Sequence, residues 1–285
     1  MPPVPASLAV PPRTLLVGCG ALGTRLGRRL VREGGQVCAL RRTTAGLPAD
    51  FTALAVDLRA PVSRELPAVD AMVITLPPGG PSGARSQGND DGYLASLRNL
   101  AAALPQVPPR VVLVSSTRVL GGHAGERPLT EQDAPAPVGP RAATLLEGER
   151  LATELLDAQI LRPAGIYGPG REMLLRTVLE GAPVQYARRT NRIHEDDLVR
   201  ALHALLTVAD PPRLLHAVDR SPASLGEVVT FIAGRLGVPP PPPLQPAEAT
   251  GTVLDGSRLL DLLGSLDHPD YRSGYGHLIA TRGGT

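Results

Sequence analysis

The sequence LLVGCGALG, residues 15–23, decides the fold. Three apolar residues typical of a buried strand run into Gly-x-Gly-x-x-Gly, and a helical pattern follows at once. Gly18 permits a sharp turn after the strand, and Gly20 lets the backbone come close to a pyrophosphate. Gly23 lets the following helix pack closely on the sheet. This order predicts a strand–loop–helix unit that binds a dinucleotide.

The helix after the glycines supplies the second half of the expected phosphate site. Leu22, Leu26 and Leu30 recur every four residues and form one apolar face. The first N–H groups of a helix have no partner within it and can bind an anion. The alternative is a glycine turn with no ligand. We expect the phosphates of a dinucleotide to lie against Gly18, Gly20, Ala21, Leu22 and Gly23.

Composition limits the class of protein. The 285 residues are 42% hydrophobic and 20% charged, enough for one large α/β unit or two modest domains. A nucleic-acid-binding protein usually has a strong positive charge and aromatic side chains on which bases stack. The net charge here is only +2 and only 2% of the residues are aromatic, so no nucleic-acid partner is expected. Cys19 and Cys38 are expected to be buried reduced thiols, so neither a disulfide nor a metal is expected. No signal peptide and no membrane-spanning run is evident, which predicts a cytoplasmic protein with a disordered lead over 1–12.

Strands and helices alternate along the first half of the chain. This rhythm predicts a doubly wound parallel Rossmann sheet, an α/β fold, over 13–168. Apolar runs predict the strands 14–17, 36–40, 53–56, 71–76, 111–114 and 159–161. Helical periodicity predicts helices over 21–32, 93–104 and 141–156.

After about residue 168 the pattern becomes shorter and more broken. We expect residues 169–285 to form a smaller C-terminal α/β cap that shapes a substrate cleft, with about 187–218 returning to the Rossmann core. The expected elements are helices over 172–180, 195–208, 225–236, 257–263 and 271–279, strands over 184–186 and 214–218, and a polyproline II connector over 238–246.

The end of the second strand bears on the choice of cofactor. An acidic residue at this point holds the adenosine ribose hydroxyls in the NAD-binding pattern. This chain has Arg41 and Arg42 there, and paired guanidiniums bind a 2′-phosphate through charge-assisted hydrogen bonds. The alternative is a solvated strand end. The sequence therefore favours NADP over NAD, with Asp57 placed to meet the adenine edge.

Ligands of such a sheet bind beyond the carboxyl ends of its strands. A segment rich in Gly, Ser and Asp follows the fourth strand up to Gly92 and is expected to be a mobile loop. The remaining expected cofactor-binding residues follow the strands at this edge: Leu58, Leu76, Pro77, Pro78, Ser115, Pro163 and Ile166.

Four motifs, in this order, resemble those of the extended short-chain dehydrogenase/reductase superfamily, in its NAD-dependent epimerase/dehydratase group. Besides 18–23 they are 115–121, similar to Ser-Ser-x-x-Val-Tyr-Gly, 161–170, similar to Leu-Arg-Pro-x-x-Ile-Tyr-Gly-Pro-Gly, and 191–198, similar to Ile-His-Val-Asp-Asp-Leu. The resemblance runs from Thr14 to the end. It implies an NAD(P)-dependent oxidoreductase or epimerase-like protein, a small polar or sugar-like substrate, and a homodimer or monomer.

The chain departs from that family at two places. Extended members usually carry Gly-x-x-Gly-x-x-Gly, and the shorter spacing with the arginine pair is similar to an atypical bacterial branch typified by YeeZ-type proteins. Active members also carry a Tyr and, four residues later, a Lys, which move a proton. Here Arg141 and Leu145 fall at those positions, and neither side chain can release a proton. Two hypotheses stay open: an enzyme with another proton source, and an NADP(H)-binding sensor without turnover, as in the NmrA-like branch.

Several polar residues are candidates for the remaining chemistry. Ser116 matches the family's catalytic Ser, which orients the substrate oxygen. His123 lies in the loop after the fifth strand and can exchange a proton, and Arg141 can polarise a carbonyl or bind an anion. The expected substrate-contacting residues are Thr117, Tyr167, Arg171 and Arg192.

Residues 194–197, His-Glu-Asp-Asp, are interpreted as a helix start and not as a metal site. Acidic residues are favoured there by capping and by the helix dipole. Consecutive side chains at a helix start point in different directions, so we expect that they do not all converge on one ion.

Overall fold

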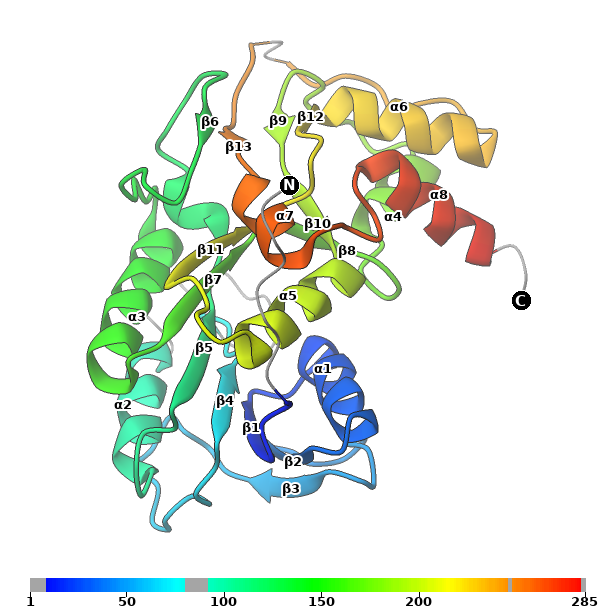
Figure 1. Ribbon diagram of the computed structural model, residues 1–285. Coiled ribbons are helices and arrows are strands. Elements are labelled where there is room, and N and C mark those ends of the chain that lie inside the picture. Colours follow the sequence, from blue (N-terminus) through cyan, green and yellow to red (C-terminus); the bar gives the residue numbers. More distant parts are fainter. Residues whose placement is uncertain (1–8, 80–91, 246–247, 283–285) are drawn as a thin grey trace.

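The computed structural model describes residues 9–79, 92–245 and 248–282 (Figure 1). Its centre is a seven-stranded sheet in the order β11-β7-β5-β4-β1-β2-β3, in which every adjacent pair is parallel. The strands are β1 (Arg13–Val17), β2 (Gln36–Arg41), β3 (Thr52–Ala55), β4 (Ala71–Ile74), β5 (Arg110–Val114), β7 (Gln159–Pro163) and β11 (Leu214–Ala217). The doubly wound parallel fold expected from the sequence is confirmed. The strand order reverses between β1 and β4, where such sheets bind their ligands.

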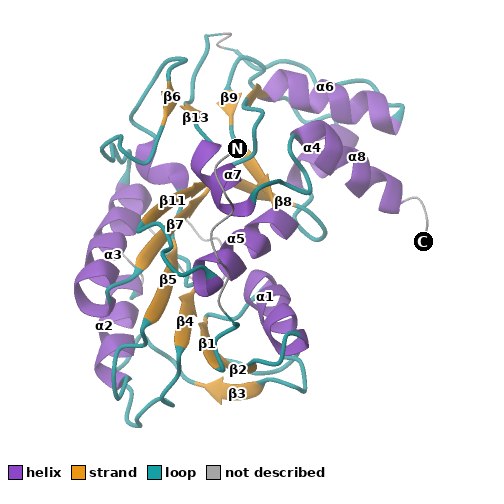
Figure 2. Ribbon diagram, viewed as in Figure 1, coloured by secondary structure: helices purple, strands orange, loops and turns teal. Residues whose placement is uncertain are grey.

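Helices cover both faces of the sheet (Figure 2). Side chains alternate along β1, so Leu16 enters one hydrophobic core while Leu15 and Val17 enter the other. The Leu16 face is covered by α1 (Ala21–Arg32), α5 (Glu195–Thr207) and α7 (Ser257–Leu263), and the opposite face by α2 (Tyr93–Ala103) and α3 (Pro140–Leu156). Both faces of the inner strands are therefore buried, which explains their continuous apolar runs, whereas the edge strand β3 is mostly exposed.

Helix ends follow their local signals closely. The helices α1, α6 (Leu225–Leu236) and α7 begin and end where the sequence predicted. In α6 the Ser224 hydroxyl accepts the N–H of Glu227, whose carboxylate accepts the N–H of Ser224. Gly237, with a φ of +69°, ends this helix in the left-handed conformation. Such signals lie within a few residues of each other, so the sequence alone specifies them.

Three expectations differ from the structure. Residues 184–186 do not form a strand, because only Val184 pairs, in a single bridge with Pro243. The fourth strand ends at Ile74, since the Thr75 hydroxyl turns back to donate to the carbonyls of Val17 and Gly18. Of the lead, residues 9–12 are described: Val10 packs against the core and the carbonyl of Pro12 accepts the N–H of Gln36, so this part is tied to the sheet. Most of the expected loop up to Gly92 lies outside the described residues.

The second half of the chain forms a third hydrophobic core beside the sheet, between α4 (Met173–Leu179), α6 and α8 (Tyr271–Arg282). Three small two-stranded sheets were not predicted, because two or three residues carry no readable periodicity. They are β8 (Gly165–Tyr167) with β10 (Arg192–His194), β9 (Arg189–Thr190) with β12 (Ala223–Ser224), and β6 (Pro128–Leu129) with β13 (Val253–Leu254). Both β11 and α5 return to the central sheet from this half. Within the described ranges, none of the helices has the length and apolar character needed to cross a membrane.

Candidate functional site

The glycine loop after β1 has the backbone that its sequence predicted. Gly18 has a φ of +76°, and its N–H donates to the carbonyl of Leu40 over 2.9 Å. A Cβ on Gly18 would lie 3.0 Å from Leu76 Cδ2 and 3.3 Å from the Leu76 nitrogen, so a side chain would be both strained and crowded. Gly20 caps α1 without any side-chain hydrogen bond, and Gly20 and Ala21 are exposed. The first N–H groups of α1 are therefore open to an anion.

The parallel strands bring the other expected cofactor residues to the same edge of the sheet. Leu76 follows β4, Ser115 follows β5, and Pro163 ends β7. Leu76 and Ile166 are half-buried, Pro77 is exposed, and Pro78 is buried. Leu58 differs from the rest of the set, because its side chain lies in the core that α2 and α3 cover and its carbonyl accepts the Asn99 amide over 2.8 Å.

Two guanidiniums stand at the carboxyl end of β2. Arg41 is half-buried and Arg42 is exposed, and neither side chain forms a hydrogen bond or ion pair with a described residue, although the Arg41 carbonyl accepts the N–H of Val56. Asp57, on the neighbouring segment, instead accepts hydrogen bonds from Arg59, which lower the pKa of its carboxyl to about 2. The side chains of Arg41 and Arg42 therefore form no ion pair with Asp57, and they can bind an anionic group.

Ser116 and Thr117 start a short 3-10 helix, η1 (Thr117–Leu120), directly after β5. The Ser116 oxygen accepts the N–H of Arg118 over 3.2 Å, which leaves the hydroxyl proton available for another acceptor. The Thr117 hydroxyl donates to the carbonyl of Pro163 at 3.4 Å. Ser116 is half-buried.

The positions that replace the Tyr and Lys lie on the first turns of α3. Arg141 is exposed and has no hydrogen-bond or ion-pair partner among the described residues. Leu145 is buried against Val119, Leu120 and other apolar residues, so packing occupies the Lys position. His123 lies on the loop after η1, before α3, and its Nε2 donates to the carbonyl of Ala134 over 2.8 Å. In that tautomer the Nδ1 atom can accept a proton and has none to give.

Two of the expected substrate residues beyond β7, Tyr167 and Arg192, are buried. The Tyr167 ring stacks on Tyr275 at 4.5 Å, and its hydroxyl donates to the carbonyl of Asp270 at 3.4 Å. Burial raises the pKa of Tyr167 far above its usual value. Arg192 is buried, donates to the Thr190 hydroxyl and lies over the Tyr271 ring. The structure brings Tyr167 and Arg192 together inside the cap core.

Arg171, by contrast, is exposed. Its Nε atom lies 3.9 Å from Glu195 Oε2, and Arg25 Nη1 lies 2.9 Å from Glu195 Oε1. Glu195 is almost fully buried. Arg171 from the cap and Arg25 from α1 therefore both lie next to one buried carboxylate. The contact joins α1 to the motif at 191–198.

A buried polar network behind Ser116 was not predicted from the sequence. Glu149 on α3 accepts the hydroxyl of Ser115 and pairs with Arg162 of β7, whose Nη2 lies 2.7 Å from its Oε2. Ser115 therefore donates to Glu149, although the sequence placed it among the cofactor residues. The sequence signal was the Arg-Pro of the 161–170 motif, but no spacing rule identifies Glu149 as its partner.

Asp219 is a second buried group that the sequence reasoning missed. It follows β11, one oxygen accepts the N–H of Ser221 over 3.1 Å, and the other has no hydrogen-bond partner in the part of the chain described. Burial raises the pKa of this carboxyl to about 7. It therefore titrates near neutral pH.

The motif 194–197 forms the helix start that its sequence indicated, since α5 begins at Glu195 and carries three acidic residues in its first turn. The four residues do point in different directions: Glu195 meets Arg25 and Arg171, while Asp197 accepts the N–H groups of Asp267 and His268. His194 also caps α5, since its Nδ1 accepts the N–H of Asp196. However, His194 and Asp196 approach each other beside His268, a residue that no sequence spacing connects with them. Burial and the neighbouring His268 lower the pKa of His194 to about 4.

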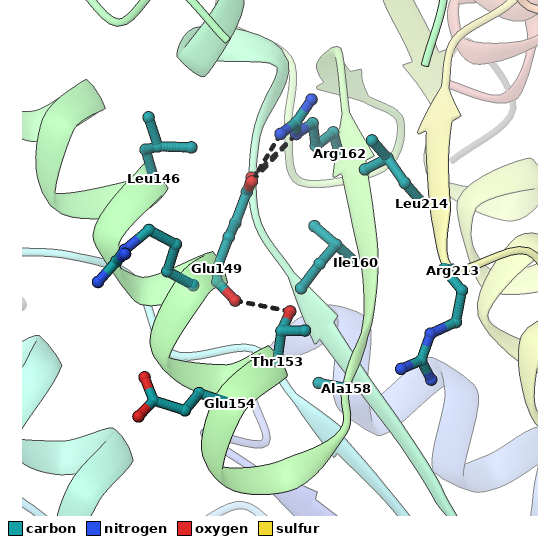
Figure 3. A pocket seen from close by; sticks show the side chains of 10 residues that line it. Leu146, Glu149, Thr153, Glu154, Ala158, Ile160, Arg162, Arg213 and Leu214 are labelled. Atoms are coloured by element: carbon teal, nitrogen blue, oxygen red, sulfur yellow. Dashed lines mark hydrogen bonds and ion pairs between the residues drawn. The ribbon is translucent and has the colours of Figure 1, made fainter. Parts of the chain in front are cut away.

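Two surface pockets lie away from the carboxyl edge of the sheet. One, of about 500 Å³, lies between α3 and the strands β7 and β11, with Glu149, Arg162 and Arg213 in its lining (Figure 3). The other, of about 560 Å³, lies on α6 and α8 beside Tyr271 and Arg272. The residues expected to hold the cofactor do not line either pocket.

Comparison with known proteins gives one partial family match and many structural ones. The family model "RmlD substrate binding domain" matches residues 93–200. Sequence comparison with curated proteins finds no match. A solved protein from Methylobacillus flagellatus, provisionally named as an NAD-dependent epimerase/dehydratase, is 30% identical, with 95% of this chain and 98% of that chain covered and a TM-score of 0.74.

Two further solved structures are similar over the whole chain. MoeE5, in complex with UDP-glucuronic acid and NAD, is 25% identical, with 96% of this chain and 100% of that chain covered and a TM-score of 0.74. TunA, an NAD-dependent NDP-hexosamine 5,6-dehydratase involved in tunicamycin biosynthesis, is 21% identical, with coverages of 96% and 98% and a TM-score of 0.77. The second likeness concerns the fold alone.

Proposed function

This chain belongs to the extended short-chain dehydrogenase/reductase superfamily, in its NAD-dependent epimerase/dehydratase group, and from that premise we propose that it binds NADP(H) and acts on a small polar, sugar-like substrate. NAD is the alternative cofactor. A nucleotide sugar is the substrate class that MoeE5, a protein of similar structure, binds. The atypical YeeZ-like branch is the part of the family that we propose for it.

Two features together support the cofactor proposal: Gly20 and Ala21 of the glycine loop are exposed, and the side chains of Arg41 and Arg42 have no ion-pair partner among the described residues. The pyrophosphate would lie against Gly18, Gly20 and the first N–H groups of α1, where backbone donors and the helix dipole favour an anion. The 2′-phosphate would lie against Arg41 and Arg42. The glycine loop follows β1 and the two arginines follow β2, and these strands are adjacent and parallel. One bound nucleotide can therefore reach both groups.

The bound nicotinamide would supply or accept a hydride, and the residues of the chain would handle the substrate. The Ser116 hydroxyl keeps its proton free and would donate it as a hydrogen bond to the substrate oxygen. Arg141 would stabilise negative charge on that oxygen without giving up a proton. His123 would accept the hydroxyl proton at Nδ1 when an alcohol is oxidised, as the tautomer that binds Ala134 allows, and its protonated ring would return that proton to the oxygen when a carbonyl is reduced.

Calorimetric titration with NADPH and NADH tests the cofactor proposal. We expect NADPH to bind more tightly, and the double substitution Arg41→Ala/Arg42→Ala to weaken NADPH by about 10–100-fold, the value of one or two charge-assisted contacts. NADH binding should change little. Arg28→Ala, which removes an exposed arginine from α1, is the matched control. Equal affinity for both nucleotides in the unsubstituted protein would remove the role of the arginines and leave the fold assignment intact.

The second candidate function is a sensor that binds NADP(H) without turnover. Leu145 favours it, because an apolar residue buried at the Lys position cannot lower the pKa of a neighbouring acid. Oxidation of NADPH with a panel of carbonyl compounds and nucleotide sugars separates the two. Turnover that is lost in Ser116→Ala supports the enzyme, whereas tight binding with no turnover supports the sensor.

A further inference from the structure

Three ligand-type side chains meet at the border between the central sheet and the cap. His194 ends β10, Asp196 lies on the first turn of α5, and His268 lies on the loop before α8. Asp196 Oδ2 is 3.4 Å from His194 Nδ1 and 3.5 Å from His268 Nε2, and one ligand atom from each of the three residues lies within 4.8 Å of the other two. Both histidines are buried, while the Asp196 side chain is 35% exposed. The cluster can therefore be reached from solvent through the carboxylate.

The spacing of these atoms matches the ligand shell of a small divalent cation. Zinc binds His nitrogen at about 2.0–2.1 Å and carboxylate oxygen at about 2.0–2.2 Å in a tetrahedron. Two ligands of such a tetrahedron lie about 3.4 Å apart, by simple geometry from those bond lengths. The separations of Asp196 Oδ2 from His194 Nδ1 and from His268 Nε2 are close to this value. We propose that His194, Asp196 and His268 bind one divalent transition metal ion of the zinc class, with water completing the coordination.

The surroundings hold the ligands in place before any ion binds. Asp197, fully buried, accepts the N–H of Asp267 over 2.8 Å and that of His268 over 2.9 Å. Arg200 bridges Asp197 and Asp267, which fixes the loop that carries His268 against α5. Supporting hydrogen bonds of this kind orient metal ligands in proteins.

Asp196 is also held by a neighbour, whereas the Nε2 atom of His194 has no hydrogen-bond partner in the part of the chain described. Arg25 donates to Asp196 Oδ1 and so leaves Oδ2 facing the histidines. His194 Nδ1 accepts the N–H of Asp196 at 3.2 Å, so it carries a lone pair and no proton. Coordination would exchange this long hydrogen bond for a metal bond. The charges of Arg25 and Arg171 are offset by Glu195 and Asp196, so a cation would not enter a net positive site.

An ion here would join elements that are far apart in sequence. His268 precedes α8, whose Tyr275 stacks on Tyr167 of β8, and the Tyr167 ring lies edge-on to His194. Asp196 is tied through Arg25 to α1, the helix of the phosphate loop. The metal would therefore clamp the C-terminal part of the cap against the N-terminus of α5.

The test uses the full chain without a histidine tag, first treated with a chelator and then titrated with Co²⁺ and with Zn²⁺. Co²⁺ binding is followed by its visible absorption, which is intense only in tetrahedral or five-coordinate sites, and Zn²⁺ binding by competition with a coloured chelator. We expect one ion per chain. His268→Gln and Asp196→Asn should each weaken binding at least about tenfold, since each removes a ligand. His277→Gln is the matched control, because its exposed ring lies 5.5 Å from that of His268 and is not part of the three.

Thermal unfolding with and without Zn²⁺ gives a second readout. The melting temperature of the unsubstituted chain and of His277→Gln should rise with Zn²⁺, and that of His268→Gln should not. Should Asp196→Asn fail to fold because Arg25 loses its partner, His268→Gln still decides. The proposal is overturned if the unsubstituted chain gives no Co²⁺ absorption, or if His268→Gln binds as tightly as the control. NADPH titration is independent of this result, so the two proposals fail separately.

Discussion

Removing the charge of Glu149 while keeping its shape should destabilise the protein strongly. Its carboxylate accepts hydrogen bonds from Arg162 Nε over 3.0 Å and from Arg162 Nη2 over 2.7 Å. The side chain of Glu149 is only 6% exposed and that of Arg162 only 4%. In Glu149→Gln the Arg162 guanidinium keeps its charge in the interior but faces an amide that carries donors of its own. Breaking a buried pair from one side costs about 3–5 kcal/mol, because an uncompensated charge stays buried.

Equilibrium unfolding in urea, followed by circular dichroism, measures this loss. The same helix offers a matched control in Glu147, which pairs with Arg150 over 3.1 Å on the surface. Glu147→Gln should cost less than about 1 kcal/mol, as exposed pairs do. For a chain of this size the loss in Glu149→Gln corresponds to a melting temperature lower by roughly 5–8 °C.

A second substitution separates charge from packing. If the buried charge causes the loss, adding Arg162→Met to Glu149→Gln removes that charge and should restore at least half of the lost free energy of unfolding. The reasoning is refuted if Glu149→Gln is as stable as Glu147→Gln, or if the double variant is no more stable than the single one. In either case Glu149 and Arg162 would contribute by shape alone.

Three further outcomes are expected. Gly274→Ala on α8 should cost about 1–3 kcal/mol in urea unfolding, because its Cβ would lie 1.9 Å from the Tyr167 hydroxyl oxygen, whereas Gly276→Ala, with nothing within 4 Å, should stabilise the helix by about 0.5–1 kcal/mol. The pKa of Asp219 is about 7 in the folded chain against 3.8 unfolded, so the protonated carboxyl stabilises the fold at low pH and this stability is lost as the pH rises from about 4 to 7. The free energy of unfolding of Asp219→Asn should therefore rise relative to that of the unsubstituted chain by about 1.4 kcal/mol per pH unit in this window. Urea unfolding at pH values on both sides of the window measures the difference. Ser224→Ala should cost about 1 kcal/mol of unfolding free energy by removing the cap of α6, and an unchanged urea midpoint would contradict that role.

The sequence could predict what depends on neighbouring residues. The glycine loop, the start and end of α1, and the capping box of α6 are each specified within a few positions, so their patterns are readable without the fold. The order of strands and helices also predicted the parallel sheet, because a parallel pair needs a long crossover and helices provide it. Since parallel strands end at one edge, the placement of Gly18, Ser115 and Pro163 there followed as well.

Contacts between distant residues were decided only by the tertiary structure. The sequence could not show that Ser115 donates to Glu149, that Tyr167 stacks on Tyr275, or that His268 reaches His194 across more than seventy residues. Hydrophobic periodicity says which face of an element is buried but not which polar side chain of another element it meets. The packing of the helices and loops determines these partners. A buried polar group forms its hydrogen bonds with whichever groups lie near it in space, however distant they are along the chain.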